Sequence, residues 1–173
     1  MGANISFNEL DLFKNDYTLL SDFIDFFCGK CIGEGESRSV YEFRLDNTLV
    51  IKIDRIDDLK GRRGFSNALE YELYNNVKDD YPKIAQFMAP CISISKCGKV
   101  MLQKKTRPLT DKEKKLLPKK IPALFTDIKL ENWGMLSGKF VCHDYANNTC
   151  FTLAANTNFK KAEWLERGLS VVK

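Results

Sequence analysis

The first residue that could do chemistry is Lys52, which stands in the centre of an aliphatic stretch. The run Thr48–Ile53 consists largely of β-branched and aliphatic residues, which is typical of a strand, and Lys52 lies between Ile51 and Ile53. Burying an ammonium group is costly unless it meets an anion. We therefore expect Lys52 to bind an anionic group. The alternative is that strand alternation points its side chain at solvent.

A carboxylate that could hold Lys52 follows on the next expected helix, Ser66–Val77. Glu70 lies eighteen residues beyond Lys52 and has apolar neighbours in that helix. A charge-assisted bond between the two side chains would fix the ammonium for contact with a phosphate. Glu72 competes for this place, but its side chain projects about 200° round the helix from that of Glu70, so only one of the two faces the sheet.

A glycine pair precedes this strand, in the turn-rich stretch 33–37. Gly33 and Gly35 follow one expected strand and, with Ser37, lead into the next. Such a pair makes a tight hairpin, or it leaves backbone N–H groups open to an anion such as a phosphate. The pair by itself does not distinguish these two interpretations.

A dense set of polar residues follows in the second half, at Asp127–Asn132 and again at Asp144. Here the chain resembles the protein-kinase superfamily. Asp-Ile-Lys-x-x-Asn is similar to the catalytic loop, and Asp-Tyr-Ala is similar to the magnesium-binding Asp-Phe-Gly. Trp133–Gly134 and Phe140–Val141 match the short hairpin expected between them. The motif Asn-Trp-Gly…Asp-Tyr resembles the corresponding sequence of small kinase-like proteins encoded by bacteriophages. Five elements in the family's order cover residues 33–146.

The resemblance implies a phosphate-binding role for the glycine pair and the lysine in the first half of the chain. The backbone around Gly33, Gly35 and Ser37 would cover the phosphates of ATP. Lys52, held by Glu70, would contact the α- and β-phosphates.

The resemblance also implies roles for the later residues. Asp127 would orient or deprotonate the attacking hydroxyl, and Lys129 would stabilise the γ-phosphate. Asn132 and Asp144 would bind Mg²⁺. The residues near Gln103 to Thr106 would be the hinge that offers backbone hydrogen bonds to adenine. Phosphoryl transfer depends on positioning and charge neutralisation rather than on a protein nucleophile, which is why this combination matters.

The elements that must position these residues indicate an α+β fold. Helices are expected at Phe7–Phe27, Ser66–Val77, Asp111–Leu117 and Lys160–Gly168, and strands at Lys30–Ile32, Val40–Phe43, Thr48–Ile53, Met88–Ser95, Val100–Gln103 and Phe140–Cys142. With the resemblance, this order predicts a protein-kinase-like two-lobe fold with an antiparallel N-lobe sheet and a strongly reduced C-lobe. Residues 1–103 would be an N-terminal helix plus the N-lobe, and residues 104–173 would be the hinge and the reduced C-lobe.

The chain departs from the family's pattern at three places. Arg38 replaces the third glycine of the loop, and Phe125–Thr126 replaces the usual His-Arg before the catalytic aspartate. About twenty residues separate the hinge from Asp127, and 27 of the 173 residues follow Ala146. We therefore expect a complete nucleotide site without a complete peptide-docking lobe.

Composition and charge limit the classes of partner that we expect for this chain. No run of eighteen apolar residues exists, which excludes a membrane-spanning helix, and the N-terminus does not have the pattern of a secretory signal. We expect a cytoplasmic protein, in the host cytoplasm if it is encoded by a phage. The stretch 104–120 holds eight Lys or Arg residues but no aromatic residues to stack bases, so nucleic acid is disfavoured and a solvated connector helix is preferred.

Six cysteines are present, and we interpret them as reduced, mostly buried thiols. Cys28 and Cys31 have the spacing of half a zinc site, although no second pair has matching spacing. Zinc and unligated thiols both remain open interpretations at this point.

The function predicted is an ATP–Mg²⁺-dependent phosphotransferase, specifically a minimal protein Ser/Thr kinase that phosphorylates itself or a partner, with a host protein as substrate or target. The alternative is a pseudokinase-like binding module that inhibits or sequesters a host protein. Phosphorylation of a small molecule is a third possibility, but no convergent set of pocket residues follows Ala146.

Overall fold

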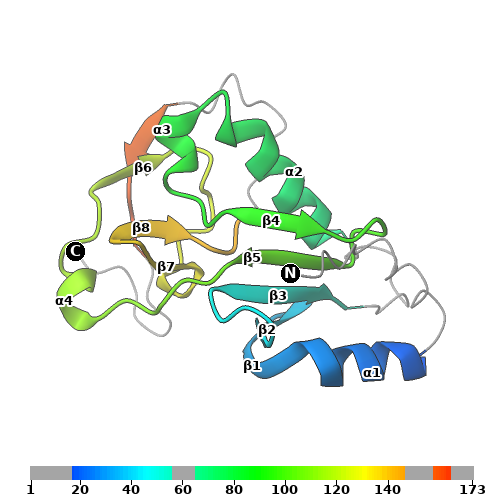
Figure 1. Cartoon of the computed structure of the whole chain (residues 1–173). Helices are drawn as coiled ribbons and strands as arrows, with labels where there is room; N and C mark the ends of the chain where they lie inside the picture. The colour runs from blue at the N-terminus through cyan, green and yellow to red at the C-terminus, as the bar shows by residue number, and fades with distance from the viewer. Residues whose placement is uncertain (1–16, 56–64, 147–157, 165–173) are drawn as a thin grey trace. The chain divides into compact units, whose positions relative to one another are not determined.

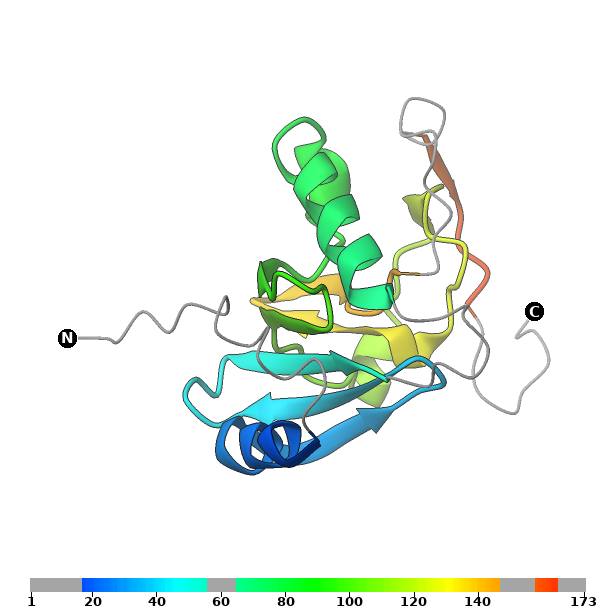
Figure 2. The same cartoon turned by 90° about the vertical axis from the view of Figure 1, so that its right-hand side faces the viewer.

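The computed structural model describes residues 17–55, 65–146 and 158–164, with side chains from residue 21 onward. The chain forms two compact units, and each is described by itself. Figure 1 labels the helices and strands, and Figure 2 gives a second view of the same elements. The first unit comprises Met1–Tyr71 and Cys91–Lys104, and the second comprises Glu72–Pro90 and Lys105–Lys173. The described elements are a mixture of helices and strands, as expected for an α+β protein.

The first unit is built on a five-stranded antiparallel sheet. Its strands stand in the order β1-β2-β3-β5-β4. Their bounds are Cys28–Glu34 (β1), Arg38–Phe43 (β2), Leu49–Asp54 (β3), Cys91–Ile94 (β4) and Val100–Lys104 (β5). Helix α1, Tyr17–Phe27, precedes β1, and helix α2, Ser66–Lys78, follows β3.

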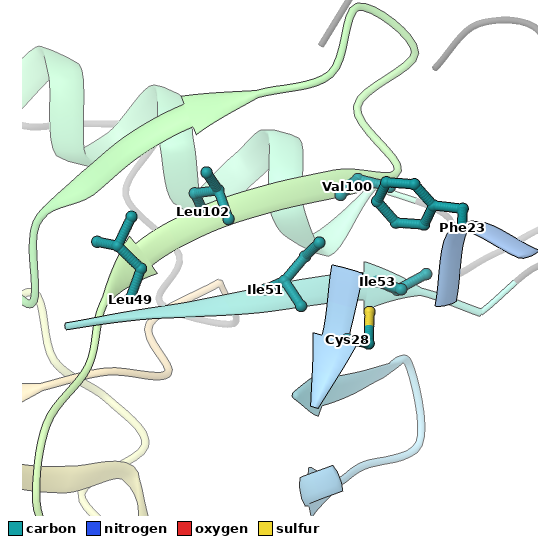
Figure 3. Packing of buried hydrophobic residues seen from close by; sticks show 7 residues of the cluster. All are labelled: Phe23, Cys28, Leu49, Ile51, Ile53, Val100 and Leu102. Carbon is teal, nitrogen blue, oxygen red and sulfur yellow. The ribbon is translucent and has the colours of Figure 1, made fainter. Parts of the chain in front are cut away.

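Strand β3 is buried along its whole length because both faces of the sheet are covered there. Leu49, Ile51 and Ile53 lie on one face and pack in a cluster that includes Phe23 of α1 (Figure 3). The cluster consists of Phe23, Cys28, Leu49, Ile51, Ile53, Val100 and Leu102. Each large aliphatic side chain buried there contributes about 1.5–3 kcal/mol. The alternate positions, Lys52 among them, therefore point to the other face.

The second unit is made of short elements. After the end of α2 come α3 (Pro82–Ala85), α4 (Asp111–Lys114), β6 (Lys120–Pro122), a 3₁₀ turn (Leu130–Asn132), β7 (Trp133–Leu136), β8 (Lys139–Cys142) and β9 (Phe159–Lys161). Strand β6 pairs with β9, and β7 pairs with β8. Trp133 lies at the centre of a cluster of edge-to-face aromatic contacts. Its ring centroid is 5.0 Å from that of Phe125 and 5.1 Å from that of Trp164. Edge-on packing of this kind stabilises the unit beyond simple burial.

The β7–β8 hairpin turns on two residues with positive φ. Ser137 has a φ of 50° and Gly138 a φ of 79°, which is the conformation of a type I′ turn. This turn suits the twist of the two strands and sets the register in which Trp133 pairs with Cys142. Residues just outside that pair, Asn132 and His143, are thereby brought next to each other.

Gly134 should be the glycine of the second unit that tolerates a side chain least. A Cβ atom there would lie 2.7 Å from the carbonyl oxygen of Arg107 and 2.8 Å from Thr106 Cβ. Backbone would have to shift, so we expect Gly134→Ala to lower the free energy of unfolding by about 1–3 kcal/mol. Urea unfolding measures this, with Gly138 as the comparison because a Cβ there meets nothing within 4 Å. Gly138→Ala then shows only the backbone effect of a positive φ.

Most elements expected from the sequence are present, and the differences have local causes. The strands expected at Val40–Phe43, Thr48–Ile53 and Val100–Gln103 and the helix expected at Ser66–Val77 are confirmed within one or two residues. The first expected helix is present from Tyr17, and residues 7–16 lie outside the described residues. The helix expected at Asp111 ends at Lys114, after a first turn capped by Thr110 and Glu113.

The helix expected at Lys160–Gly168 is wrong where the structure describes it. Lys160 and Lys161 lie in β9 and pair with Ile121 and Lys120. Residues 165–168 lie outside the described residues. Pairing with β6, a strand that was not expected, decides the conformation of this segment.

Candidate functional site

Lys52 and Glu70 form a buried ion pair inside the first unit. Lys52 Nζ lies 2.6 Å from Glu70 Oε1, and the two side chains are 3% and 0% exposed. Glu72 is exposed. The choice between the two glutamates is thus decided for Glu70, and the alternative of a solvent-facing Lys52 is wrong.

Glu70 binds more donors than the sequence indicates. Its Oε1 also accepts a hydrogen bond of 2.8 Å from Gln103 Nε2, and its Oε2 accepts one of 2.5 Å from Arg38 Nη2. Burial by itself would raise the pKa of Glu70, but the charges of Arg38 and Lys52 outweigh it and lower the pKa to about 2. The carboxylate is therefore ionised, and both of its oxygens accept hydrogen bonds.

Asn67 links this ion cluster to the backbone. Its Nδ2 donates to the carbonyl oxygens of Lys52, at 3.0 Å, and Lys99, at 2.9 Å. Its Oδ1 accepts from Arg38 Nη1 at 3.2 Å. The first turns of α2 are thereby tied to β3 and to the chain entering β5.

Arg38 and Gln103 occupy places that the resemblance assigned differently. Arg38 stands where a loop glycine was expected, yet it opens β2 and its side chain is buried. In the β2–β3 register it lies opposite Asp54, and Val40 lies opposite Lys52. In this register, strand alternation along β2 and β3 places Arg38 on the same face of the sheet as Lys52.

Gln103 lies within β5, and its backbone pairs with Val50 on one side and Cys91 on the other. The part of Gln103 that reaches the cluster is its side chain, which sequence reasoning missed. The hinge contact to adenine stays a prediction.

Asp54 belongs to the same buried cluster, but one of its two carboxylate oxygens lacks a hydrogen-bond partner among the described residues. Its side chain is buried, and Oδ2 accepts one hydrogen bond of 3.2 Å from the backbone N–H of Asn67. Its Oδ1 has no hydrogen-bond partner among the described residues. Burial raises the pKa of Asp54 to about 6, against the opposing effects of the Asn67 N–H group and the Arg38 and Lys99 charges.

This shifted pKa makes a testable contribution to stability. A carboxyl whose pKa is higher in the folded than in the unfolded state destabilises the fold as pH rises through the window between the two values, here about 4 to 6. The loss in the free energy of unfolding from this shift is at most about 3 kcal/mol. We expect Asp54→Asn to unfold at higher urea concentration than wild type at neutral pH, with the difference shrinking towards about pH 4. A difference independent of pH would contradict this account.

The glycine loop lies one strand away from Lys52. Gly33 pairs with Val40, which in turn pairs with Lys52. The Gly35 N–H donates to the carbonyl of Arg38 at 2.9 Å and closes the turn. A Cβ at Gly33 or Gly35 would meet only ordinary contacts, 3.6 Å or longer. Packing among the described residues therefore does not require glycine at either position.

The second unit brings Asp127, Lys129 and Asn132 together on one loop. Lys129 Nζ lies 3.3 Å from Asp127 Oδ2, and both side chains are partly exposed. Asn132 Nδ2 donates to the carbonyl oxygen of Asp127 at 3.5 Å, which leaves the side-chain oxygen of Asn132 as a potential cation ligand. The 3₁₀ turn Leu130–Asn132 sets this spacing.

Asp144 follows the end of the β7–β8 hairpin and is held from both sides. The His143 N–H donates to the carbonyl of Asn132 at 2.8 Å. The imidazole of His143 bonds Thr106 Oγ1 at 2.9 Å and the carbonyl oxygen of Glu131 at 3.0 Å. On the other side, the Tyr145 hydroxyl donates to the carbonyl of Ala89 at 2.7 Å. Through these bonds His143 orients the segment that contains Asp144.

Oxygen atoms of Asn132 and Asp144 fit a hard cation such as Mg²⁺. The described residues contain no group of three or more His, Cys, Asp or Glu side chains that could hold a metal ion by themselves. Mg²⁺ commonly binds through one or two protein ligands and completes its octahedron with water and phosphate oxygens. This pair is compatible with a metal that arrives with a nucleotide.

The half zinc site considered for Cys28 and Cys31 finds no support in the described part of the chain. Cys28 is buried in the apolar cluster, and burial raises the pKa of its thiol to about 11. Cys31 is exposed and contacts the carbonyl of Gly33. One thiol faces the core and the other faces solvent, so they do not converge on one ion.

The sequence-predicted site residues thus fall into two groups, each inside one unit. The first group contains Gly33, Gly35, Ser37, Lys52, Glu70 and Gln103, and the second contains Asp127, Lys129, Asn132 and Asp144. No protein-family model and no curated protein matches the chain. Among the described residues, no helix is long and apolar enough to cross a bilayer.

Proposed function

We propose that this chain is an ATP–Mg²⁺-dependent phosphotransferase of the protein-kinase superfamily, a minimal protein Ser/Thr kinase with a two-lobe fold and a reduced C-lobe. The observation that carries the proposal is the buried pair of Lys52 and Glu70, 2.6 Å apart. A lysine taken out of water and fixed by a helix carboxylate is suited to phosphate contact. Its combination with Asp127, Asn132 and Asp144 is difficult to explain by stability alone.

In this proposal the first unit binds the phosphates. Lys52 donates to the α- and β-phosphates, and the turn at Gly33, Gly35 and Ser37 covers them with backbone N–H groups. Glu70 does not contact the nucleotide and acts by holding Lys52.

The second unit supplies the groups around the transferred phosphoryl. The substrate hydroxyl oxygen attacks the γ-phosphorus while the bond to the β,γ-bridging oxygen breaks, so ADP leaves and a phosphate ester forms. Asp127 orients that hydroxyl and accepts its proton. Lys129, 3.3 Å from Asp127, stabilises charge on the γ-phosphoryl oxygens. Asn132 and Asp144 would hold Mg²⁺, which neutralises phosphate charge when bound.

The substrate we propose is a Ser or Thr hydroxyl of this chain itself or of a partner protein in a host cytoplasm. A direct test is the conversion of ATP to ADP, and the intact mass of the chain, after incubation with ATP and Mg²⁺. Lys52→Ala should abolish any phosphoryl gain and any ADP formed. A stable protein partner whose binding is unaffected by Asp127→Ala and Asp144→Ala, without ADP formation, would favour the pseudokinase-like alternative.

A further inference from the structure

Arg38 is a buried charged residue that the proposed function does not use. It opens β2, its side chain is 5% exposed, and its guanidinium spans two residues of α2. Nη2 lies 2.5 Å from Glu70 Oε2, and Nη1 lies 3.2 Å from Asn67 Oδ1. Because these bonds engage the guanidinium inside the unit, Arg38 acts through α2 rather than on a nucleotide.

The bond to Arg38 fixes the orientation of the Glu70 carboxylate. One oxygen, Oε1, accepts from Lys52 at 2.6 Å and from Gln103 at 2.8 Å. The other, Oε2, accepts from Arg38. The donors come from β3, β5 and β2, so three strands hold one helix side chain. Rotation of the carboxylate, or withdrawal of α2 from the sheet, would leave two buried cations without their anion, which is strongly unfavourable.

We propose that Arg38 is a positioning residue that locks Glu70 onto Lys52 in the nucleotide-free protein. Helix α2 then does not act as a switch, and Lys52 is ready for phosphate without an activating modification. This inference rests on the proposed function for its consequence in catalysis. The lock itself is a property of the first unit and can be tested without any activity.

The test compares Arg38→Met and Arg38→Lys with Arg55→Met as the matched control. Arg55 forms an exposed ion pair with Glu34 in the same unit, so its removal controls for loss of an arginine. Amide hydrogen exchange is followed without nucleotide. We expect Arg38→Met to exchange about tenfold faster in residues 66–71 than wild type, because a bond to a charged group is lost there. Arg38→Lys should recover most of the protection, and Arg55→Met should match wild type.

The catalytic consequence is read separately from kcat and the KM for ATP. We expect kcat to fall about tenfold in Arg38→Met with a smaller change in KM, because Lys52 is bound but misaligned, and Arg38→Lys to restore much of kcat. If Arg38→Met does not fold, Arg38→Gln takes its place, since it keeps a polar side chain but removes the charge, and exchange in residues 66–71 no faster than in wild type then overturns the lock. Exchange in Arg38→Met no faster than in Arg55→Met also overturns it. If no form turns over ATP, the proposed function fails while the exchange result still stands.

Discussion

Replacing Glu70 by alanine is expected to lower the free energy of unfolding by about 3–5 kcal/mol, the largest effect on stability that we predict for a single side chain. The reason is not the loss of one contact. Arg38 and Lys52 are both buried beside this carboxylate, and its removal leaves two cations in the interior without the carboxylate that pairs with them. Urea unfolding at neutral pH measures the loss.

Two comparisons make this result specific. Glu72→Ala, two residues along the same helix, removes an exposed carboxylate and should change stability by less than about 0.5 kcal/mol. The folded pKa of Glu70 is lowered from its ordinary value of 4.5 to about 2, so its stabilisation is present above about pH 4.5 and is lost as pH falls towards 2. The gap between wild type and Glu70→Ala should therefore narrow in acid. Equal losses for the two alanine variants would show that the buried ion pair is not stabilising the fold.

Asp127→Asn is expected to slow phosphoryl transfer by about 10²–10⁴-fold while Mg²⁺–ATP still binds. The amide keeps the shape of the side chain but cannot accept the proton of the attacking hydroxyl. Asp127 is 27% exposed and pairs with Lys129 at 3.3 Å, so the substitution should leave the fold intact. Glu131→Gln, an exposed carboxylate of the same loop, is the matched control and should retain wild-type transfer.

The measurement is transfer from ATP labelled in the γ-phosphate, with nucleotide affinity determined in parallel by calorimetry. Loss of affinity in Asp127→Asn would indicate a binding role instead of a role in transfer. Wild-type transfer by this variant would remove Asp127 from the proposed mechanism.

The contribution of the sequence differs between the parts of this site. Lys52 and Glu70 could be predicted because each depends on a local pattern, a charge inside an aliphatic strand and a carboxylate on the apolar side of the next helix. Their pairing then required only that strand and helix meet. The loop that carries Asp127 and Asn132 was likewise recognisable as a contiguous motif.

Residues that join the cluster through long-range register were missed. Arg38 reaches Glu70 because β2 pairs with β3 in one register, and a shift by one residue would turn its side chain to the opposite face. Gln103 was assigned to a hinge, yet β5 extends to Lys104 and buries its side chain against Glu70. Neither outcome is encoded in the neighbouring residues.

The same reason explains the error at Lys160 and Lys161. Strands β6 and β9 are three residues long each, and they lie far apart in the sequence. Their pairing, rather than a local periodicity, makes this segment a strand. Strands of only three residues carry little signal of their own in the sequence.

The measurement that tests the central claim most directly is labelling by γ-phosphate-labelled ATP with Mg²⁺, using purified chain alone and chain added to a cell extract. The account predicts label on the chain or on a discrete protein, lost when Mg²⁺ is chelated and lost again with Asp127→Asn, but retained with Glu131→Gln. The absence of any labelling that depends on both Mg²⁺ and Asp127 would contradict the assignment of this chain as a phosphotransferase.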